Sequence, residues 1–198
     1  MRDKYGVNQD PYCYPDSDVL INLLNLRDAD ALAEAESQFV RFRYMEYVCK
    51  INVLEDFTLE HFLQSHHVLF QDIYAWAGQF RNIDISKGET HFCNCQFIGR
   101  ELAKQLKRLP TLRECEDREA VVALTTDIFC EINVIHPFRE GNGRSTRFFF
   151  EELLFVAGYE IAWPAISKET WIKANIDGFY GDLKGLNVIF DQAIQHRM

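Results

Sequence analysis

The chain has 198 residues, of which 47% are hydrophobic, and its formal net charge is -9 at pH 7. This length suits one domain with a sizeable core, and no run of about eighteen apolar residues predicts a membrane-spanning helix. The acidic balance argues against direct nucleic-acid binding, which needs a basic face, and no apolar stretch after Met1 forms a secretory signal, so a cytoplasmic protein is expected.

The first part of the chain predicts an arm and two helices. Residues 1–18 are rich in Asp, Tyr, Pro and Asn and lack periodicity, which indicates an ordered or semi-ordered N-terminal arm. A helical pattern follows at about 28–48. A clearer helix is expected to begin after Thr58, a suitable N-cap, and to end near Gly78, since glycine often follows the last helical residue. Two residues of this helix are interpreted as packing or surface residues rather than as ligands: His66 and His67.

Residues 80–95 interrupt the helical pattern. β-Branched residues precede Lys87 and Gly88, which predicts a short hairpin. The helical period returns in five later segments: 97–109, 119–135, 144–156, 167–180 and 181–196. The second of these should end at His136, because a residue before proline is disfavoured in the α region. No repeat or linker divides the sequence, so residues 1–198 are expected to form a single all-α domain.

The stretch from His136 to Arg147 carries the chemistry. It is a glycine-rich loop that opens into the helix expected at 144–156, which is apolar around most of its circumference and so belongs in the middle of the protein. Backbone N–H groups at such a helix start converge on the loop, an arrangement that binds anions and above all phosphates. The glycines let the backbone approach the ligand without a Cβ in between.

The charged residues of this stretch fit a phosphate site. Arg144 and Arg147 lie in the first helical turn, where an exposed cation opposes the helix dipole at a cost of about 0.3–1 kcal/mol. A multiply charged anion between them outweighs that cost. Glu140 would repel this anion unless a hard cation such as Mg²⁺ joins the carboxylate to the phosphates. His136 stands at the entry to the loop, where an imidazole can take a proton from an incoming nucleophile.

Plainer interpretations compete with this one. A lone histidine before a proline is usually structural, and arginines at helix starts often pair with nearby carboxylates. Other phosphate motifs do not fit, however. The chain has no Gly-Lys dipeptide for a P-loop, and Thr146 occupies the third glycine position of a dinucleotide fingerprint.

At these residues the sequence resembles the Fic family, whose signature is H-x-F-x-[D/E]-G-N-G-R-x-x-R. All eight specified positions are present, with Glu140 in the acidic one. The segment Trp76–Gly78, followed by Arg81 and the hairpin at 83–92, resembles the end of a Fic helix and the family's flap. The segment Asp10–Tyr12 resembles the leader of the bacterial Fic toxins.

The resemblance implies a Fic fold, which is a helical bundle around the motif helix with a short β-hairpin flap. It also implies transfer of AMP from ATP to a Ser, Thr or Tyr hydroxyl of a target protein. In that scheme His136 is the general base and Glu140 holds Mg²⁺ at the α- and β-phosphates. Arg144 helps to bind the phosphates, and Arg147 grips the γ-phosphate. Three residues form the anion hole: Gly141, Asn142 and Gly143.

The resemblance extends to the flap, the nucleotide and the partners. Lys87 and Gly88 would lie on the flap and hold the target segment by strand pairing, and Asn175 would contact the nucleotide. Family members with a built-in inhibitory helix carry [S/T]-x-x-x-E-[G/N]. Here Glu140 alone is followed by Gly or Asn, and it belongs to the loop. We therefore expect a bacterial toxin with a separate small antitoxin, and a topoisomerase such as DNA gyrase as its target.

Three functions are compatible with these residues. The first is the adenylyltransferase just described. The second is a Fic-fold transferase with another nucleotide or phosphate-linked donor, since the motif specifies phosphate chemistry more firmly than it specifies a base. The third is a non-catalytic nucleotide-binding regulator. The presence of His136 argues against the third function, because a pure binder needs no base at that position.

Overall fold

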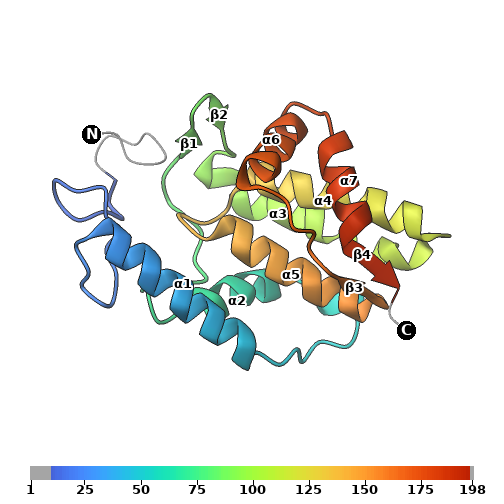
Figure 1. Ribbon diagram of the computed structural model, residues 1–198, viewed down its shortest axis with the longest axis horizontal. Coiled ribbons are helices and arrows are strands. Elements are labelled where there is room, and N and C mark those ends of the chain that lie inside the picture. Colours follow the sequence, from blue (N-terminus) through green and yellow to red (C-terminus); the bar gives the residue numbers. More distant parts are fainter. Residues whose placement is uncertain (1–9, 197–198) are drawn as a thin grey trace.

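The computed structural model describes residues 10–196, which form a mostly helical protein (Figure 1). Seven α-helices follow one another in this part of the chain: α1 Ala29–Glu46, α2 Leu59–Phe70, α3 Ile98–Leu106, α4 Arg118–Ile135, α5 Asn142–Val156, α6 Lys168–Phe179 and α7 Lys184–Ala193. Three short 3₁₀ segments connect some of them: η1 Leu54–Asp56, η2 Cys95–Phe97 and η3 Leu109–Glu114. The helical fold class expected from the sequence is confirmed.

Two small antiparallel sheets complete the fold. The first is a hairpin in which β1 Ser86–Lys87 pairs with β2 Thr90–His91. It lies inside the segment where the sequence predicted a hairpin. The second joins β3 Tyr159–Ile161 to β4 Ile194–His196. No helix in the described part is both long and apolar enough to cross a membrane.

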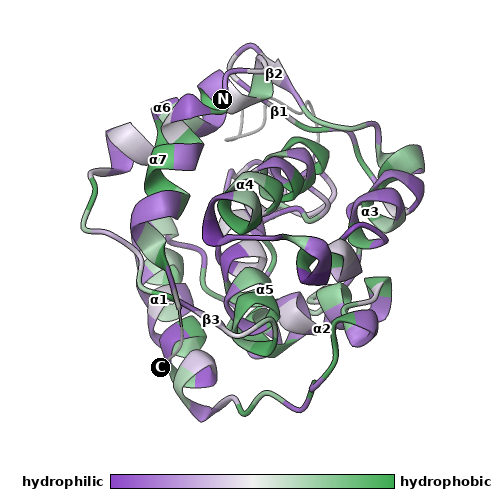
Figure 2. Ribbon diagram, turned by 90° about the vertical axis from the view of Figure 1, so that its right-hand side faces the viewer, coloured by the Kyte–Doolittle hydropathy of each residue, from purple (hydrophilic) through white to green (hydrophobic). Residues whose placement is uncertain are grey.

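The motif helix α5 lies in the middle of the molecule. Figure 2 shows α4 and α5 at the centre, with α2 and α3 on one side and α6 and α7 on the other. The side chains of Phe149, Phe150, Leu153 and Leu154 on α5 are fully buried. Burying each such side chain contributes about 1.5–3 kcal/mol. The helix that begins at the motif loop is therefore anchored in the main core by these four side chains.

The helix α2 is shorter than the sequence indicated. It begins after Thr58, whose hydroxyl accepts a hydrogen bond from the His61 N–H at 3.3 Å, as expected for an N-cap. However, it ends at Phe70 and not near Gly78. Gly78 has a left-handed backbone (φ +79°), and its N–H donates to Nδ1 of His66 at 2.9 Å. This contact folds the intervening residues back against the helix as turns, although their apolar residues continue the helical period.

The ends of α4 and α5 frame the motif loop. The helix α4 ends at Ile135 as predicted, and His136 is its C-cap. His136 is left-handed (φ +49°, ψ +63°), a conformation uncommon outside glycine. The helix α5 begins at Asn142, two residues before the predicted start, because Gly141 adopts a left-handed N-cap conformation (φ +78°). Two left-handed residues thus turn the chain sharply between the helices.

The two ends of the chain also differ from expectation in part. The described portion of the arm, from Asp10, is non-helical, and Cys13 forms an isolated antiparallel bridge with Leu20; residues 1–9 lie outside the described part. The helix expected at 181–196 is wrong in its last turn. Ile194 takes an extended backbone after α7 and begins β4, which pairs with β3. Strands of three residues are too short for a periodicity argument to detect.

Candidate active site

A cavity of about 300 Å³ lies between the hairpin, α4, the motif loop and α6. Its volume is that of a small-molecule site. The hairpin and α6 stand at the same end of the molecule in Figure 1. Six of the ten residues predicted to form the site line this cavity: Lys87, His136, Glu140, Asn142, Gly143 and Asn175. Aromatic and aliphatic side chains make up most of the remaining lining: Phe92, Phe129, Trp171, Ile172, Ile176 and Phe179.

The motif loop is closed by the side chain of Asn142. Its Oδ1 accepts from the Phe138 N–H and its Nδ2 donates to the Phe138 carbonyl, each at 2.7 Å. Asn142 and Phe138 are both buried. The amide therefore holds the loop from inside. The N–H of Arg144 donates to the Gly141 carbonyl at 3.1 Å, whereas the N–H groups of Asn142 and Gly143, the first two of α5, precede the first intrahelical bonds. Since these groups point out of the helix start at the cavity, they suit an anion.

The two motif glycines serve different purposes. A Cβ on Gly141 would lie 2.3 Å from Cζ of Phe70, and its φ is +78°, so both space and backbone require glycine. Gly143 has ordinary helical geometry, and a Cβ there would meet no atom of the described chain within 4 Å. Gly143 lines the cavity. Its missing side chain therefore leaves room for a ligand and not for the protein's own packing.

The imidazole of His136 is held from two directions. Nδ1 lies 3.2 Å from the carbonyl oxygen of Asn133, one turn back on α4. A carbonyl can only accept, so Nδ1 carries a proton, and in the neutral imidazole Nε2 is the basic nitrogen. The ring of Phe92, just after β2, stacks on the imidazole with centroids 3.9 Å apart and planes at 13°. The ring of His136 is thus oriented where it borders the cavity.

Glu140 is positioned through its main chain by a residue whose role the sequence did not reveal. Nε2 of His66 donates to the Glu140 carbonyl at 3.0 Å, while Nδ1 of His66 accepts from Gly78. The imidazole stacks between Phe70 and Phe138, with centroid distances of 4.6 and 3.8 Å. Burial lowers the pKa of His66 to about 3, so it is neutral. The prediction that His66 is a packing residue is confirmed.

The two motif arginines line a second, smaller hollow of about 180 Å³ between α1, α2 and α5. Arg144 pairs with Glu36 of α1 and lies 3.7 Å from Glu140. The guanidinium of Arg147 lies 5.4 Å from the ring centroid of Trp171, which lines the main cavity. Burial lowers the pKa of Arg147 from its usual value. Both arginines therefore lie next to the motif loop, and Arg144 already has carboxylate partners.

The remaining predicted residues occupy different places. Gly88 lies in the exposed turn of the hairpin with φ +59° and, like Gly141, does not line the cavity as described over residues 10–196. Asn175 donates through Nδ2 to the Trp171 carbonyl at 2.7 Å and accepts at Oδ1 from Asn133 at 3.0 Å. Its amide is therefore oriented within the wall of the cavity, between α4 and α6.

A buried ion pair joins the N-terminal arm to the motif loop. Nε of Arg139 donates to Oδ2 of Asp10 at 2.6 Å, and each side chain is only 3% exposed. Arg139 occupies an unspecified position of the motif, and Asp10 lies 129 residues away. No sequence signal links them. The resemblance of Asp10–Tyr12 to a leader segment did not indicate this partner.

The donor set fits a metal shared with phosphates. Over the described residues, no group of three or more His, Cys, Asp and Glu side chains could hold a metal ion by itself. Glu140 is the carboxylate that lines the cavity, and its Oε1 lies 3.0 Å from the Gly141 nitrogen. Mg²⁺ commonly takes only one or two protein carboxylates and completes its shell with phosphate oxygens and water. The single carboxylate of Glu140 beside the motif loop agrees with that mode of binding.

Comparison with known proteins points to one family. The Fic/DOC family model matches residues 56–154, from the last residue of η1 to the last turn of α5. The chain is 39% identical over 197 residues to "Probable protein adenylyltransferase Fic" of Escherichia coli K12, covering 98% of this chain and 96% of that one. It is 34% identical to protein adenylyltransferase VbhT of Bartonella schoenbuchensis, covering 90% of this chain but 38% of VbhT.

Solved structures agree with this fold. The N-terminal Fic domain of a putative cell filamentation protein from Bartonella quintana, solved with bound ADP, has a TM-score of 0.84 at 24% identity. It covers 94% of this chain and 95% of that one. BepC of Bartonella tribocorum with bound AMPPNP has a TM-score of 0.80 at 22% identity, covering 94% and 97%. The sequence matches, the complete motif and the shared fold show that the chain belongs to the Fic/DOC family.

Proposed function

We propose that this protein is a protein adenylyltransferase, which transfers AMP from ATP to a Ser, Thr or Tyr hydroxyl of a target protein. The proposal is supported by the names of the relatives that match over nearly the whole chain. It rests above all on one observation. The imidazole of His136 borders the same cavity as Glu140. The first two residues of α5, Asn142 and Gly143, also line this cavity.

The proposed reaction uses the residues as follows. The backbone N–H groups at the start of α5 bind phosphate oxygens of ATP, and the apolar wall on α6 receives the base. The hydroxyl oxygen of the target attacks the α-phosphorus while Nε2 of His136 takes its proton. The bond from the α-phosphorus to the bridging oxygen breaks, and pyrophosphate leaves. The Asn133 carbonyl favours this step because it accepts from Nδ1–H, at a heavy-atom distance of 3.2 Å, and so stabilises the imidazolium.

The charges around the loop complete the proposal. Glu140 would hold Mg²⁺, which supplies positive charge to the α- and β-phosphates when bound. Arg144 would help to bind the phosphates, and Arg147 would grip the γ-phosphate. For Arg144 this requires the phosphates to compete with Glu36, its ion-pair partner on α1.

The partners are also part of the proposal. The target segment would add as a strand to the hairpin at Lys87 and Gly88. A topoisomerase such as DNA gyrase is the proposed target, and a small antitoxin protein is the proposed inhibitor, both acting in the bacterial cytoplasm. A small reading frame next to the gene, encoding [S/T]-x-x-x-E-[G/N], would support the antitoxin.

The test is label transfer from ATP. The protein is incubated with Mg²⁺, a bacterial lysate, and ATP labelled with ³²P at either the α- or the γ-position. Relative to lysate without the protein, whose own kinases incorporate γ-label, the proposal predicts that the protein adds α-label to lysate proteins, that it adds no γ-label, and that His136→Ala abolishes the added α-label. His67→Gln, on α2, is the matched control and should transfer normally. Transfer of the γ-label, or equal labelling by His136→Ala, would refute the proposal; α-labelled GTP, CTP and UTP identify the preferred donor.

A further inference from the structure

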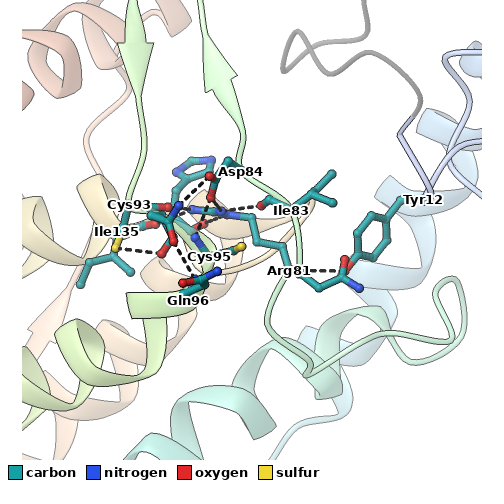
Figure 3. A network of polar contacts seen from close by, with 11 residues as sticks. Tyr12, Arg81, Ile83, Asp84, Cys93, Cys95, Gln96 and Ile135 are labelled. Atoms are coloured by element: carbon teal, nitrogen blue, oxygen red, sulfur yellow. Dashed lines mark hydrogen bonds and ion pairs between the residues drawn. The ribbon is translucent and has the colours of Figure 1, made fainter.

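Arg81 is a buried arginine, only 2% exposed, and it lies beneath the hairpin. Figure 3 shows its side chain running toward backbone groups from three separate segments. Nη1 donates to the Ile83 carbonyl at 2.6 Å, and Nη2 donates to the carbonyls of Cys93 at 2.5 Å and Ile135 at 3.2 Å. Nε donates to the carbonyl of His136 at 2.9 Å.

These carbonyls belong to the two structures that the reaction must bring together. Ile83 precedes β1 and Cys93 follows β2, so they are the two ends of the hairpin segment. Ile135 and His136 are the last residue and the C-cap of α4. One planar guanidinium therefore connects both ends of the hairpin to the backbone of the proposed base. The backbone of Arg81 adds a further bond, from its N–H to the Pro137 carbonyl at 3.0 Å.

The chemistry of the side chain fits this role. A guanidinium has five N–H donors in a rigid fork and no acceptor, so it can hold several carbonyls in one fixed arrangement. A cation at the end of α4 also complements the negative end of that helix dipole. A buried charge is costly unless it is fully hydrogen-bonded, so moving one of these carbonyls away from the guanidinium would raise the free energy. Arg81 therefore holds the carbonyls in place. Asp84, with its carboxylate 3.9 Å away, adds a partly exposed counter-charge.

A second set of contacts also joins the hairpin to His136 and α4. Phe92 stacks on the His136 imidazole, and its N–H donates to the Ile85 carbonyl at 3.3 Å. The N–H of Cys93 donates to the Val134 carbonyl, also at 3.3 Å. The end of the hairpin is therefore attached to α4 by a backbone hydrogen bond from Cys93, and to His136 by the stacked ring of Phe92.

We propose that Arg81 is a positioning residue that sets the distance between the hairpin, which holds the target segment, and the imidazole of His136. This inference rests on the proposed function. In the described part of the chain Arg81 does not line the cavity, so it acts through the hairpin and His136. An error of about 1 Å in the position of a reacting group can reduce the rate about 100-fold. A residue that fixes both partners at once therefore controls the rate of transfer without contacting ATP.

The test compares Arg81→Lys with Arg118→Lys. Lysine keeps the charge but loses the planar fork. Arg118 is a matched control, because it also binds carbonyls, those of Ile194 and Asp191, but on α7 and β4. The first readout is the proton NMR signal of the His136 ring, which stacking on Phe92 shifts upfield. His136→Gln identifies the signal by removing it, and Phe92→Leu gives its position without the stacked ring.

We expect the His136 signal to move toward the Phe92→Leu position in Arg81→Lys and to stay in place in Arg118→Lys. The rate of AMP transfer to lysate proteins should fall about 100-fold in Arg81→Lys, while the dissociation constant for AMPPNP is unchanged. Phe92→Leu, which keeps an apolar side chain and leaves Arg81 intact, should fold normally and also lose rate. It provides the test if Arg81→Lys fails to fold.

Several results would overturn this inference. One is an unshifted His136 signal in the native protein relative to Phe92→Leu. Another is a normal transfer rate in a folded Arg81→Lys or in Phe92→Leu. A third is an equal loss of AMPPNP affinity and rate, which would show a general structural role. The NMR comparison needs no target protein, so it remains decisive even if the native protein transfers no AMP at all.

Discussion

Nε2 of His66 lies 3.0 Å from the carbonyl oxygen of Glu140, so a histidine of α2 holds the main chain of the proposed metal ligand. The same ring accepts from the Gly78 N–H at Nδ1. Because each ring nitrogen has a fixed task, a single neutral tautomer satisfies both bonds. Protonation would remove the acceptor that Gly78 needs and place a charge among Phe70 and Phe138.

The first prediction concerns stability in acid. Burial lowers the pKa of His66 from 6.5 to about 3. Between these two pH values the unfolded chain binds a proton at His66 that the folded chain does not. The contribution of His66 to the unfolding free energy is therefore fully present above pH 6.5 and is lost as the pH falls toward 3. His66 should remove about 1.4 kcal/mol of unfolding free energy per pH unit in this window.

Urea denaturation at several pH values measures this dependence. His66→Gln is the comparison, because its amide can still donate to Glu140 but does not titrate. The difference in unfolding free energy between native protein and variant should narrow steadily as the pH is lowered from 6.5 toward 3. A difference that is constant across this range would show that His66 titrates normally in the folded protein.

The second prediction separates the two motif glycines. Gly141→Ala should destabilise the protein by about 1–3 kcal/mol, since it places a Cβ against Phe70 in a left-handed backbone. Gly143→Ala should instead raise the unfolding free energy by about 0.5–1 kcal/mol, because alanine favours the helix and meets no neighbour. Calorimetric titration with AMPPNP should nevertheless show at least about tenfold weaker binding by Gly143→Ala, a loss of about 1.4 kcal/mol. Normal affinity in that variant would place the phosphates elsewhere.

The third prediction concerns the arm. Asp10→Asn removes the carboxylate charge that pairs with the buried guanidinium of Arg139, which should cost about 3–5 kcal/mol of unfolding free energy. The double variant Asp10→Leu with Arg139→Met should recover most of this loss, because replacing a buried pair by apolar side chains is often neutral. Urea denaturation of the native protein, Asp10→Leu, Arg139→Met and their double variant gives the coupling energy. If Asp10→Asn unfolds at the same urea concentration as the native protein, the arm does not stabilise the motif loop.

The fourth prediction tests the metal. If Glu140 holds Mg²⁺ beside the phosphates, chelation with EDTA should weaken AMPPNP binding by the native protein about tenfold or more, or about 1.4 kcal/mol. The affinity of Glu140→Gln should be low in Mg²⁺ and unaffected by EDTA. Glu160→Gln, on the exposed part of β3, serves as the control and should respond to EDTA like the native protein. A response to EDTA in Glu140→Gln equal to that of the native protein would assign the metal to other ligands.

Local signals explain what the sequence could predict. The Thr58 cap, the end of α4 at His136 and the glycine loop before an all-round apolar helix all depend on neighbouring residues, and the structure has each of them. His136, Glu140 and Gly143, which the family motif brings together in sequence, line one cavity in the structure.

Long-range contacts explain what it could not predict. The end of α2 at Phe70 depends on a hydrogen bond between His66 and Gly78. The position of the arm depends on the ion pair of Asp10 with Arg139, 129 residues away. Helical periodicity carries no information on such contacts. The four carbonyls around Arg81 are equally invisible, because every residue has a carbonyl and only the fold decides which ones meet.

A crystal structure with AMPPNP and Mg²⁺ would test the central claim most directly. We expect phosphate oxygens at the N–H groups of Asn142 and Gly143, with Nε2 of His136 facing the α-phosphorus across the space for one hydroxyl. The triphosphate should also draw Arg144 or Arg147 toward it. A nucleotide bound with its phosphates away from this loop, or with the imidazole directed elsewhere, would contradict the account.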